Sequence, residues 1–113
     1  MNRGAAAEAL AAEFLEARGL SIIARNYRCR GGEIDLIARD GETLIFVEVR
    51  LRSDASFGGA AESITTAKRR RLAFAAAHYL GRLNREPPCR FDAILLAALD
   101  AGRIEWLVDI DAN

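Results

Sequence analysis

Two acidic residues, Asp35 and Glu48, lie where neighbouring strands could hold a divalent metal ion between them. Apolar and polar residues alternate around each acid, and Asp40-Gly41 between them is a hairpin turn signal. If those two residues form the turn, Asp35 faces Phe46, and Glu48 is its diagonal neighbour at roughly 7–8 Å. Carboxylates, water and phosphate are the usual ligands of Mg²⁺. The spacing therefore predicts a site for Mg²⁺ or Mn²⁺.

Two further acids join this pair. Glu33 lies two positions before Asp35, and the same register puts it directly opposite Glu48. Glu8 lies at the border of the apolar arc of a helix predicted over residues 5–18, so we expect it to be half-buried. Opposed like charges destabilise a sheet unless they are neutralised. With Glu8, the pattern of Asp, twelve residues, Glu, one residue and Arg has the layout of a metal nuclease site.

Arginines offer an alternative explanation of the acids. Arg50 and Arg52 follow Glu48 on the same strand face and could neutralise it without any ion. From geometry alone, such a surface salt-bridge ladder is the commoner arrangement, by about two to one.

The elements that must position these residues follow from periodicity. Helices are predicted over 5–18 and 65–83, and strands over 20–27, 32–39, 43–52, 91–99 and 104–110. The strand over 43–52 is apolar on both faces at its start and charged on one face at its end, which predicts a central strand that reaches a cleft. We expect an α/β fold, with a mixed central sheet between two helices in the order α-β-β-β-α-β-β.

Length and composition restrict the class of protein. The 113 residues are enough for a single domain, residues 1–113, and 51% hydrophobic residues exclude a disordered chain. No apolar stretch is long enough to span a membrane, so no membrane partner is expected. Cys29 and Cys89 are 60 positions apart, which suits a reducing, cytoplasmic location better than a disulfide framework.

Charge is segregated although its total is zero. Residues 25–90 contain 13 basic and 8 acidic residues, whereas the two ends together contain 3 basic and 8 acidic residues. This basic middle could face the phosphates of a nucleic acid, and an ordinary solvated surface explains it equally well. The candidate nucleic-acid-binding residues are Arg25, Arg28, Arg30, Arg52, Lys68, Arg69, Arg70 and Arg71.

Several segments together resemble the YraN-type family of small bacterial proteins, which are predicted endonucleases related to archaeal Holliday-junction resolvases of the PD-(D/E)XK nuclease superfamily. The resemblance covers almost the whole chain. Its most specific segments are Gly32-Glu33-Ile34-Asp35-Leu36-Ile37 and Phe46-Val47-Glu48-Val49-Arg50, and it also includes Glu8, the segment 25–28, Phe57-Gly58, Ile64, Lys68 and the segment 90–92.

The resemblance implies a restriction-endonuclease-like three-layer α/β/α core and assigns roles to the acids. Asp35 and Glu48 become the principal metal ligands, and Glu8 a third acid, acting directly or through water. This chain has Arg50 at the position of the lysine that is usual in the superfamily. The resemblance therefore makes Arg50 a catalytic residue, but with another role than the lysine. An arginine keeps its proton, so Arg50 can orient phosphate or stabilise negative charge but cannot act as a base.

Lys68 could supply the missing amine if its helix covers the site, although phosphate binding or a solvated helix face is the favoured role. Asp92 is expected to pair with an arginine such as Arg90.

The function implied is a Mg²⁺-dependent, structure-selective DNA endonuclease that acts on branched DNA through metal-activated water. Two alternatives stay open: a nucleic-acid-binding module without turnover, and an interaction subunit of a DNA-processing assembly. Whether the chain forms a homodimer is also open.

Overall fold

The computed structural model describes residues 3–51, 64–97 and 103–110, with the exception of the Arg3 side chain. These residues form two helices and five strands in the predicted order α-β-β-β-α-β-β. The elements are α1 (Arg3–Ala17), β1 (Ser21–Cys29), β2 (Gly32–Asp40), β3 (Thr43–Leu51), α2 (Thr66–Leu80), β4 (Cys89–Leu96) and β5 (Ile104–Leu107). No helix among them is long and apolar enough to cross a membrane.

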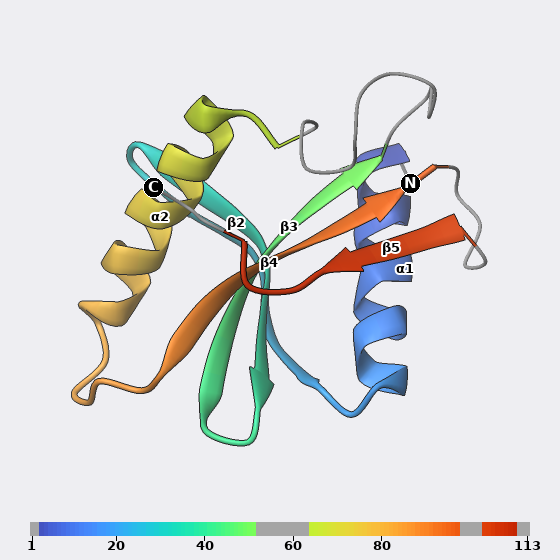
Figure 1. Ribbon diagram of the computed structural model, residues 1–113. Coiled ribbons are helices and arrows are strands. Elements are labelled where there is room, and N and C mark those ends of the chain that lie inside the picture. Colours follow the sequence, from blue (N-terminus) through green and yellow to red (C-terminus); the bar gives the residue numbers. More distant parts are fainter. Residues whose placement is uncertain (1–2, 52–63, 98–102, 111–113) are drawn as a thin grey trace.

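The five strands form one mixed sheet in the order β1-β2-β3-β4-β5. Neighbouring strands are antiparallel except for β3 and β4, which run parallel and are connected through α2. The sheet is strongly twisted and lies between the two helices (Figure 1). The predicted mixed sheet and α/β class are therefore confirmed.

Each helix covers its own apolar cluster. On the α1 side, Ala11 and Leu15 are fully buried with Val47 of β3 and Ile94 of β4. On the α2 side, the cluster includes Leu72 of the helix and Phe46 of β3. Burying a side chain such as Leu or Ile contributes roughly 1.5–3 kcal/mol. Because β3 is covered on both faces, it is the central strand that the sequence predicts.

The register of the β2–β3 hairpin differs from the prediction. Asp40 pairs with Thr43 and Leu36 with Val47, so the two-residue loop is Gly41-Glu42 and not Asp40-Gly41. Gly41 has φ 61°, a left-handed conformation that suits glycine at the first loop position. The expected pairing of Glu33 with Glu48 was therefore wrong.

A glycine sets how closely α2 approaches the sheet. A Cβ on Gly32, the first residue of β2, would lie 2.3 Å from the Arg71 carbonyl oxygen of α2. Any side chain there would push the helix away. At its N-terminal end, α2 is capped by Thr65, whose hydroxyl accepts a hydrogen bond from the Lys68 backbone N–H. Both features bring the first turns of α2 close to the start of β2.

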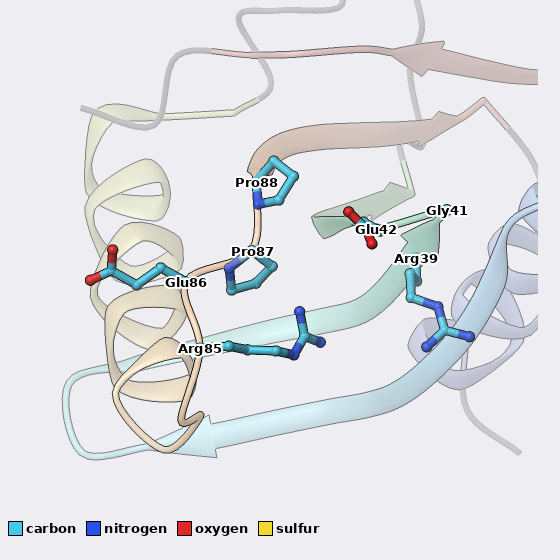
Figure 2. Close-up of a pocket in the computed structure, with 7 residues that line it drawn as sticks. All are labelled: Arg39, Gly41, Glu42, Arg85, Glu86, Pro87 and Pro88. Carbon is cyan, nitrogen blue, oxygen red and sulfur yellow. The ribbon is translucent and has the colours of Figure 1, made fainter.

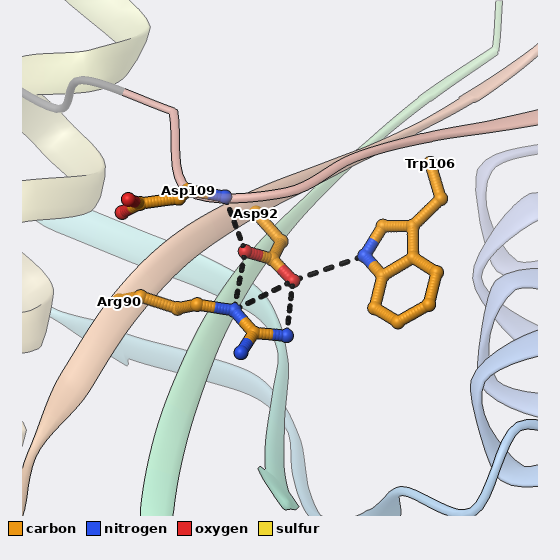
Figure 3. Close-up of polar contacts among 4 residues, drawn as sticks. All are labelled: Arg90, Asp92, Trp106 and Asp109. Atoms are coloured by element: carbon orange, nitrogen blue, oxygen red, sulfur yellow. Dashed lines mark hydrogen bonds and ion pairs between the residues drawn. The ribbon is translucent and has the colours of Figure 1, made fainter.

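Asp92 of β4 forms hydrogen bonds that connect β5 and the segment after it to the sheet. Its side chain is fully buried, and it accepts hydrogen bonds from the guanidinium of Arg90, from the Trp106 indole at 2.9 Å and from the Asp109 backbone N–H at 2.9 Å. Figure 3 shows these groups converging on one carboxylate. The expected pairing with Arg90 is confirmed, and the role of Asp92 in the fold is structural.

Candidate active site

Asp35 and Glu48 lie side by side where the β2–β3 ladder ends. The backbone pairing of the two strands ends with Leu36 and Val47. Asp35 directly precedes Leu36 in β2, and Glu48 directly follows Val47 in β3. The Val49 backbone N–H donates to Asp35 Oδ2 at 2.8 Å. This bond fixes the orientation of the Asp35 carboxylate. The observed register, continued past Leu36 and Val47, puts Asp35 directly opposite Glu48 and not diagonal to it as predicted.

The surroundings of Glu48 favour its protonated form. Burial raises the pKa of Glu48 to about 9, and both the hydrogen bond with Asp35 and the negative charge of Asp35 act in the same direction. The positive charge of Lys68 opposes this shift. At neutral pH, Glu48 is therefore protonated and hydrogen-bonded to Asp35.

A small pocket of about 170 Å³ opens over this pair. Three elements contribute to its walls: β2, β3 and the first turns of α2. The lining residues are Glu33, Asp35, Glu48, Val49, Arg50, Lys68 and Arg71. Three acids and three cations that are far apart in sequence thus surround one space.

Lys68 is the cation of this pocket with the most unusual environment. Its Nζ atom is shielded from solvent and has no hydrogen-bond partner within the described residues. Burial lowers the pKa of Lys68, the neighbouring Arg50 lowers it further, and Glu48 and Asp35 oppose the change. The side chain therefore belongs to the pocket. Of the two favoured roles, the solvated helix face does not hold, and phosphate binding stays a prediction.

Glu8 approaches the same acids from α1. As expected it is half-buried, and burial followed by the charge of Asp35 raises its pKa. A hydrogen bond from the Asn26 side chain lowers that pKa. Asn26 was not singled out in the sequence, although its φ of 52° is a conformation that asparagine tolerates well. Glu8 is thus near Asp35 but outside the pocket lining.

The salt-bridge alternative applies to Glu33. Its carboxylate contacts Arg71 at 3.3 Å and Arg28 at 3.7 Å. In the described part of the chain, neither Asp35 nor Glu48 forms a corresponding ion pair with a guanidinium. The arginines that neutralise Glu33 are thus Arg28 and Arg71 and not the predicted Arg50 and Arg52, of which Arg52 lies outside the described residues.

The acid pair fits a divalent ion. A cation can satisfy two adjacent carboxylates by replacing the proton that they share. Among the residues that the structure describes, no three His, Cys, Asp or Glu side chains are arranged to ligate one ion. Direct protein ligands would therefore be Asp35 and Glu48, with Glu8 acting through water. Binding through one or two carboxylates plus water is usual for Mg²⁺.

Comparison with known proteins places the chain in a family. The model of the uncharacterised protein family UPF0102 matches residues 7–96, which include Glu8, Asp35, Glu48 and Lys68. The chain belongs to the UPF0102 family. The YraN-type resemblance is confirmed at this level.

Several relatives match nearly end to end. A UPF0102 protein of Methylobacillus flagellatus is 59% identical over 103 residues, which are 91% of this chain and 90% of the relative. Those of Cupriavidus pinatubonensis and Nitrosospira multiformis are 57% and 54% identical over 93% of this chain and 81% and 88% of their own lengths. The arrangement of acids and cations around one pocket is thus a property to test across UPF0102 proteins.

The remaining predicted cations of this UPF0102 chain are distributed unevenly. Arg50, Lys68 and Arg71 line the pocket, and Arg28 reaches it through Glu33. Arg25, Arg30 and Arg70 are exposed outside the lining, Arg69 is half-buried, and Arg52 lies outside the described residues. Some of the predicted nucleic-acid-binding cations therefore line the pocket, and others lie outside it.

A larger hollow of about 450 Å³ lies at the opposite end of the β2–β3 hairpin. Its lining includes Arg39, Glu42, Arg85 and Glu86, all of them exposed, with two prolines between α2 and β4. In Figure 2 the Arg39 and Arg85 side chains extend toward the same space, and Glu86 points away from it. Despite its size, this hollow has no buried polar group among its lining residues, so the chemistry favours the smaller pocket.

Proposed function

We propose that this UPF0102 protein is a Mg²⁺-dependent, structure-selective DNA endonuclease that hydrolyses a phosphodiester bond. The supporting observation is that Asp35, Glu48 and Lys68, from three different elements, line one pocket. Two carboxylates can hold a divalent ion that activates water for phosphodiester hydrolysis, and an adjacent amine can accept a proton from that water. The resemblance to PD-(D/E)XK nucleases points to the same chemistry.

Each pocket residue has a distinct task in this proposal. When bound, Mg²⁺ lowers the pKa of a coordinated water and polarises the phosphodiester. Asp35, held by the Val49 N–H, and Glu48, after losing its proton, would hold the ion. Arg50 and Arg71 would orient the phosphate and stabilise negative charge, which guanidinium groups do without changing protonation.

Lys68 would replace the amine that position 50 lacks. Arg50 cannot release a proton, whereas a shielded lysine with a lowered pKa can accept one from the attacking water. The amine then comes from α2 instead of β3, and its orientation depends on the close approach at Gly32. This assignment separates two roles, phosphate orientation by Arg50 and proton transfer by Lys68.

Arg50 also supports a second candidate, a nucleic-acid-binding module without turnover. In that case the cations would hold DNA through phosphate contacts, and the affinity would be sensitive to salt but not to chelation. The third alternative, an interaction subunit, would show neither cleavage nor DNA affinity above that of a neutral control protein.

Cleavage of a branched DNA in the presence of Mg²⁺ or Mn²⁺ tests the proposal. We expect cleavage by the unmodified protein, none by Glu48→Ala, and a loss of about 100-fold or more in Lys68→Met with DNA binding retained. Arg103→Gln, which removes an exposed cation distant from the pocket residues in the sequence, is the matched control and should cleave normally. Cleavage unchanged in Glu48→Ala, or salt-sensitive binding without any cleavage, would refute the enzymatic function.

A further inference from the structure

One face of α2 carries a row of side chains that begins in the pocket. Lys68, Arg71, Phe74 and His78 are three or four positions apart, so each is a neighbour of the next on the helix surface, and the row winds from the pocket side at Lys68 to the exposed side at Phe74. Phe74 has 54% of its surface exposed, more than the other exposed large apolar side chains of the described residues, Ile23 and Val108. A helix face that is otherwise polar thus presents an accessible aromatic ring.

The backbone of the β1–β2 turn supports this ring. Gly31 has φ 93°, and a Cβ placed on it would lie only 3.2 Å from Cε1 of Phe74. The ring therefore packs against glycine backbone on one side and is accessible on another. A rigid ring loses little conformational freedom when a second flat group stacks on it.

Two arginines lie next to the turn that supports the ring. Gly31 shares a hollow of about 330 Å³ with Arg28 and Arg71, and this hollow also shares Glu33 and Arg71 with the acid pocket. Phe74 packs against Gly31, so its ring lies next to this hollow and its two arginines. An exposed ring close to guanidinium groups suits a polyanion that carries flat bases.

The next turn of the helix continues the polar surface. The Tyr27 hydroxyl of β1 contacts His78 Nδ1 at 2.5 Å and accepts a hydrogen bond from Arg82 at 3.3 Å. The Arg82 guanidinium also lies 5.7 Å from the centre of the Tyr27 ring. These contacts keep polar and cationic groups on the far side of Phe74 from the pocket.

The spacing matches a nucleic-acid strand. Phe74 is six residues after Lys68, which corresponds to about 9 Å along the helix axis. One strand of B-form DNA advances about 3.4 Å per nucleotide. A strand whose reacting phosphate lies at the acid pair would therefore bring a base a few nucleotides away to Phe74.

We propose that Phe74 stacks on an unpaired base of a DNA strand that runs along α2 from the acid pocket. This inference rests on the proposed function and specifies its substrate: a junction or flap with a single-stranded segment beside the reacting phosphate. Bases within a duplex have both faces covered by their neighbours, so only an unpaired base can use the ring. The ring thus favours a single-stranded segment over continuous duplex.

Binding measured in chelator tests stacking separately from cleavage. Removing a stacking aromatic costs roughly 1–3 kcal/mol per base, so Phe74→Ala should weaken the affinity for a single-stranded oligonucleotide about 5- to 150-fold. Affinity for a blunt duplex of equal length should change less than twofold. Phe74→Tyr should retain single-strand affinity, and Val108→Ala, at another exposed apolar position, should leave both affinities unchanged.

A fluorescence measurement gives a direct signal of stacking. The emission of a tryptophan introduced by Phe74→Trp should be quenched by the single strand, whereas Val108→Trp should not respond. Single-strand affinity equal in Phe74→Ala and the unmodified protein would overturn the inference, and so would equal losses for single strand and duplex. The stacking measurements are made in chelator and do not depend on cleavage. Failure of the cleavage assay would therefore not change the stacking result, and failure of the stacking assay would not change the cleavage result.

Discussion

At the residue scale, the central feature is a pair of adjacent carboxyl groups in which Glu48 keeps its proton at neutral pH. Glu48 is largely buried beside Asp35, and its pKa of about 9 means that the folded chain keeps a proton that an unfolded chain would release near pH 4.5. Glu33, only two positions from Asp35, is paired with two arginines instead. Neighbouring acids on one strand thus have different electrostatic environments.

The raised pKa predicts how stability depends on pH. Between about pH 4.5 and 9 the folded state binds more protons than the unfolded state, so the contribution of Glu48 is greatest below this range and is lost as pH rises. The slope cannot exceed about 1.4 kcal/mol per pH unit. Glu48→Gln should remove this contribution and become increasingly more stable than the unmodified protein toward pH 9. Urea denaturation at several pH values measures it.

Glu105→Gln provides the control for that series, because Glu105 is exposed on β5 and should not change the pH profile. Parallel stability curves for Glu48→Gln and the unmodified protein would contradict the shared proton.

At the element scale, the positions of the strands and helices followed from periodicity, whereas their alignment did not. Alternating residues indicated β2 and β3 within one or two residues, and α2 begins one residue after the start of the predicted helix over 65–83. The hairpin register was wrong because Asp40-Gly41 and Gly41-Glu42 both satisfy the need for glycine in a tight turn. The two candidate turns differ by one position, so the pairing of the whole strands, and not the turn sequence, selects between them.

The acids of the pocket were accessible to sequence reasoning, but its cations were less so. Asp35 and Glu48 share a hairpin, so their proximity is a local property. Lys68 enters the pocket only because α2 crosses from β3 to β4 and approaches Gly32 closely, and both are long-range features. Phe74 carried no recognisable signal, because a phenylalanine in an amphipathic helix is usually a core residue.

The attachment of β5 gives a prediction at this scale. Asp92→Asn removes the buried charge that Arg90, the Trp106 indole and the Asp109 backbone share. Breaking a buried pair by changing one partner costs about 3–5 kcal/mol, so the melting temperature should fall by roughly 10 °C or more. Thermal unfolding followed by circular dichroism measures this loss.

Asp109→Asn is the matched control, since Asp109 contributes its backbone N–H, and asparagine tolerates the φ of 61° at this position. It should melt close to the unmodified protein. A melting temperature unchanged by Asp92→Asn would mean that this carboxylate does not anchor the end of the chain.

At the scale of the whole molecule, zero net charge conceals a positive middle and negative ends. The described cations of that middle are concentrated on α2 and the adjacent β1–β2 turn, near the acid pocket. In the proposed function, DNA contacts the protein on this side. The energy of such binding comes from released counterions and declines as salt increases.

This charge distribution predicts a local effect of arginine removal. Arg70→Gln on α2 should reduce the slope of log affinity for DNA against log salt by about one, through loss of one phosphate contact. Arg103→Gln makes the same change in net charge but should leave the slope unchanged. Equal effects of the two variants, measured by fluorescence anisotropy over a salt series, would show that only net charge matters.

The most direct test of the central claim is calorimetric titration of the protein with Mn²⁺ near pH 7.5 in two buffers with different ionisation enthalpies. The account predicts one ion per chain, bound with release of about one proton as Glu48 ionises, and no binding by a folded Asp35→Ala variant. Equal binding by Asp35→Ala, or binding without proton release, would contradict a metal site built on this pair of acids.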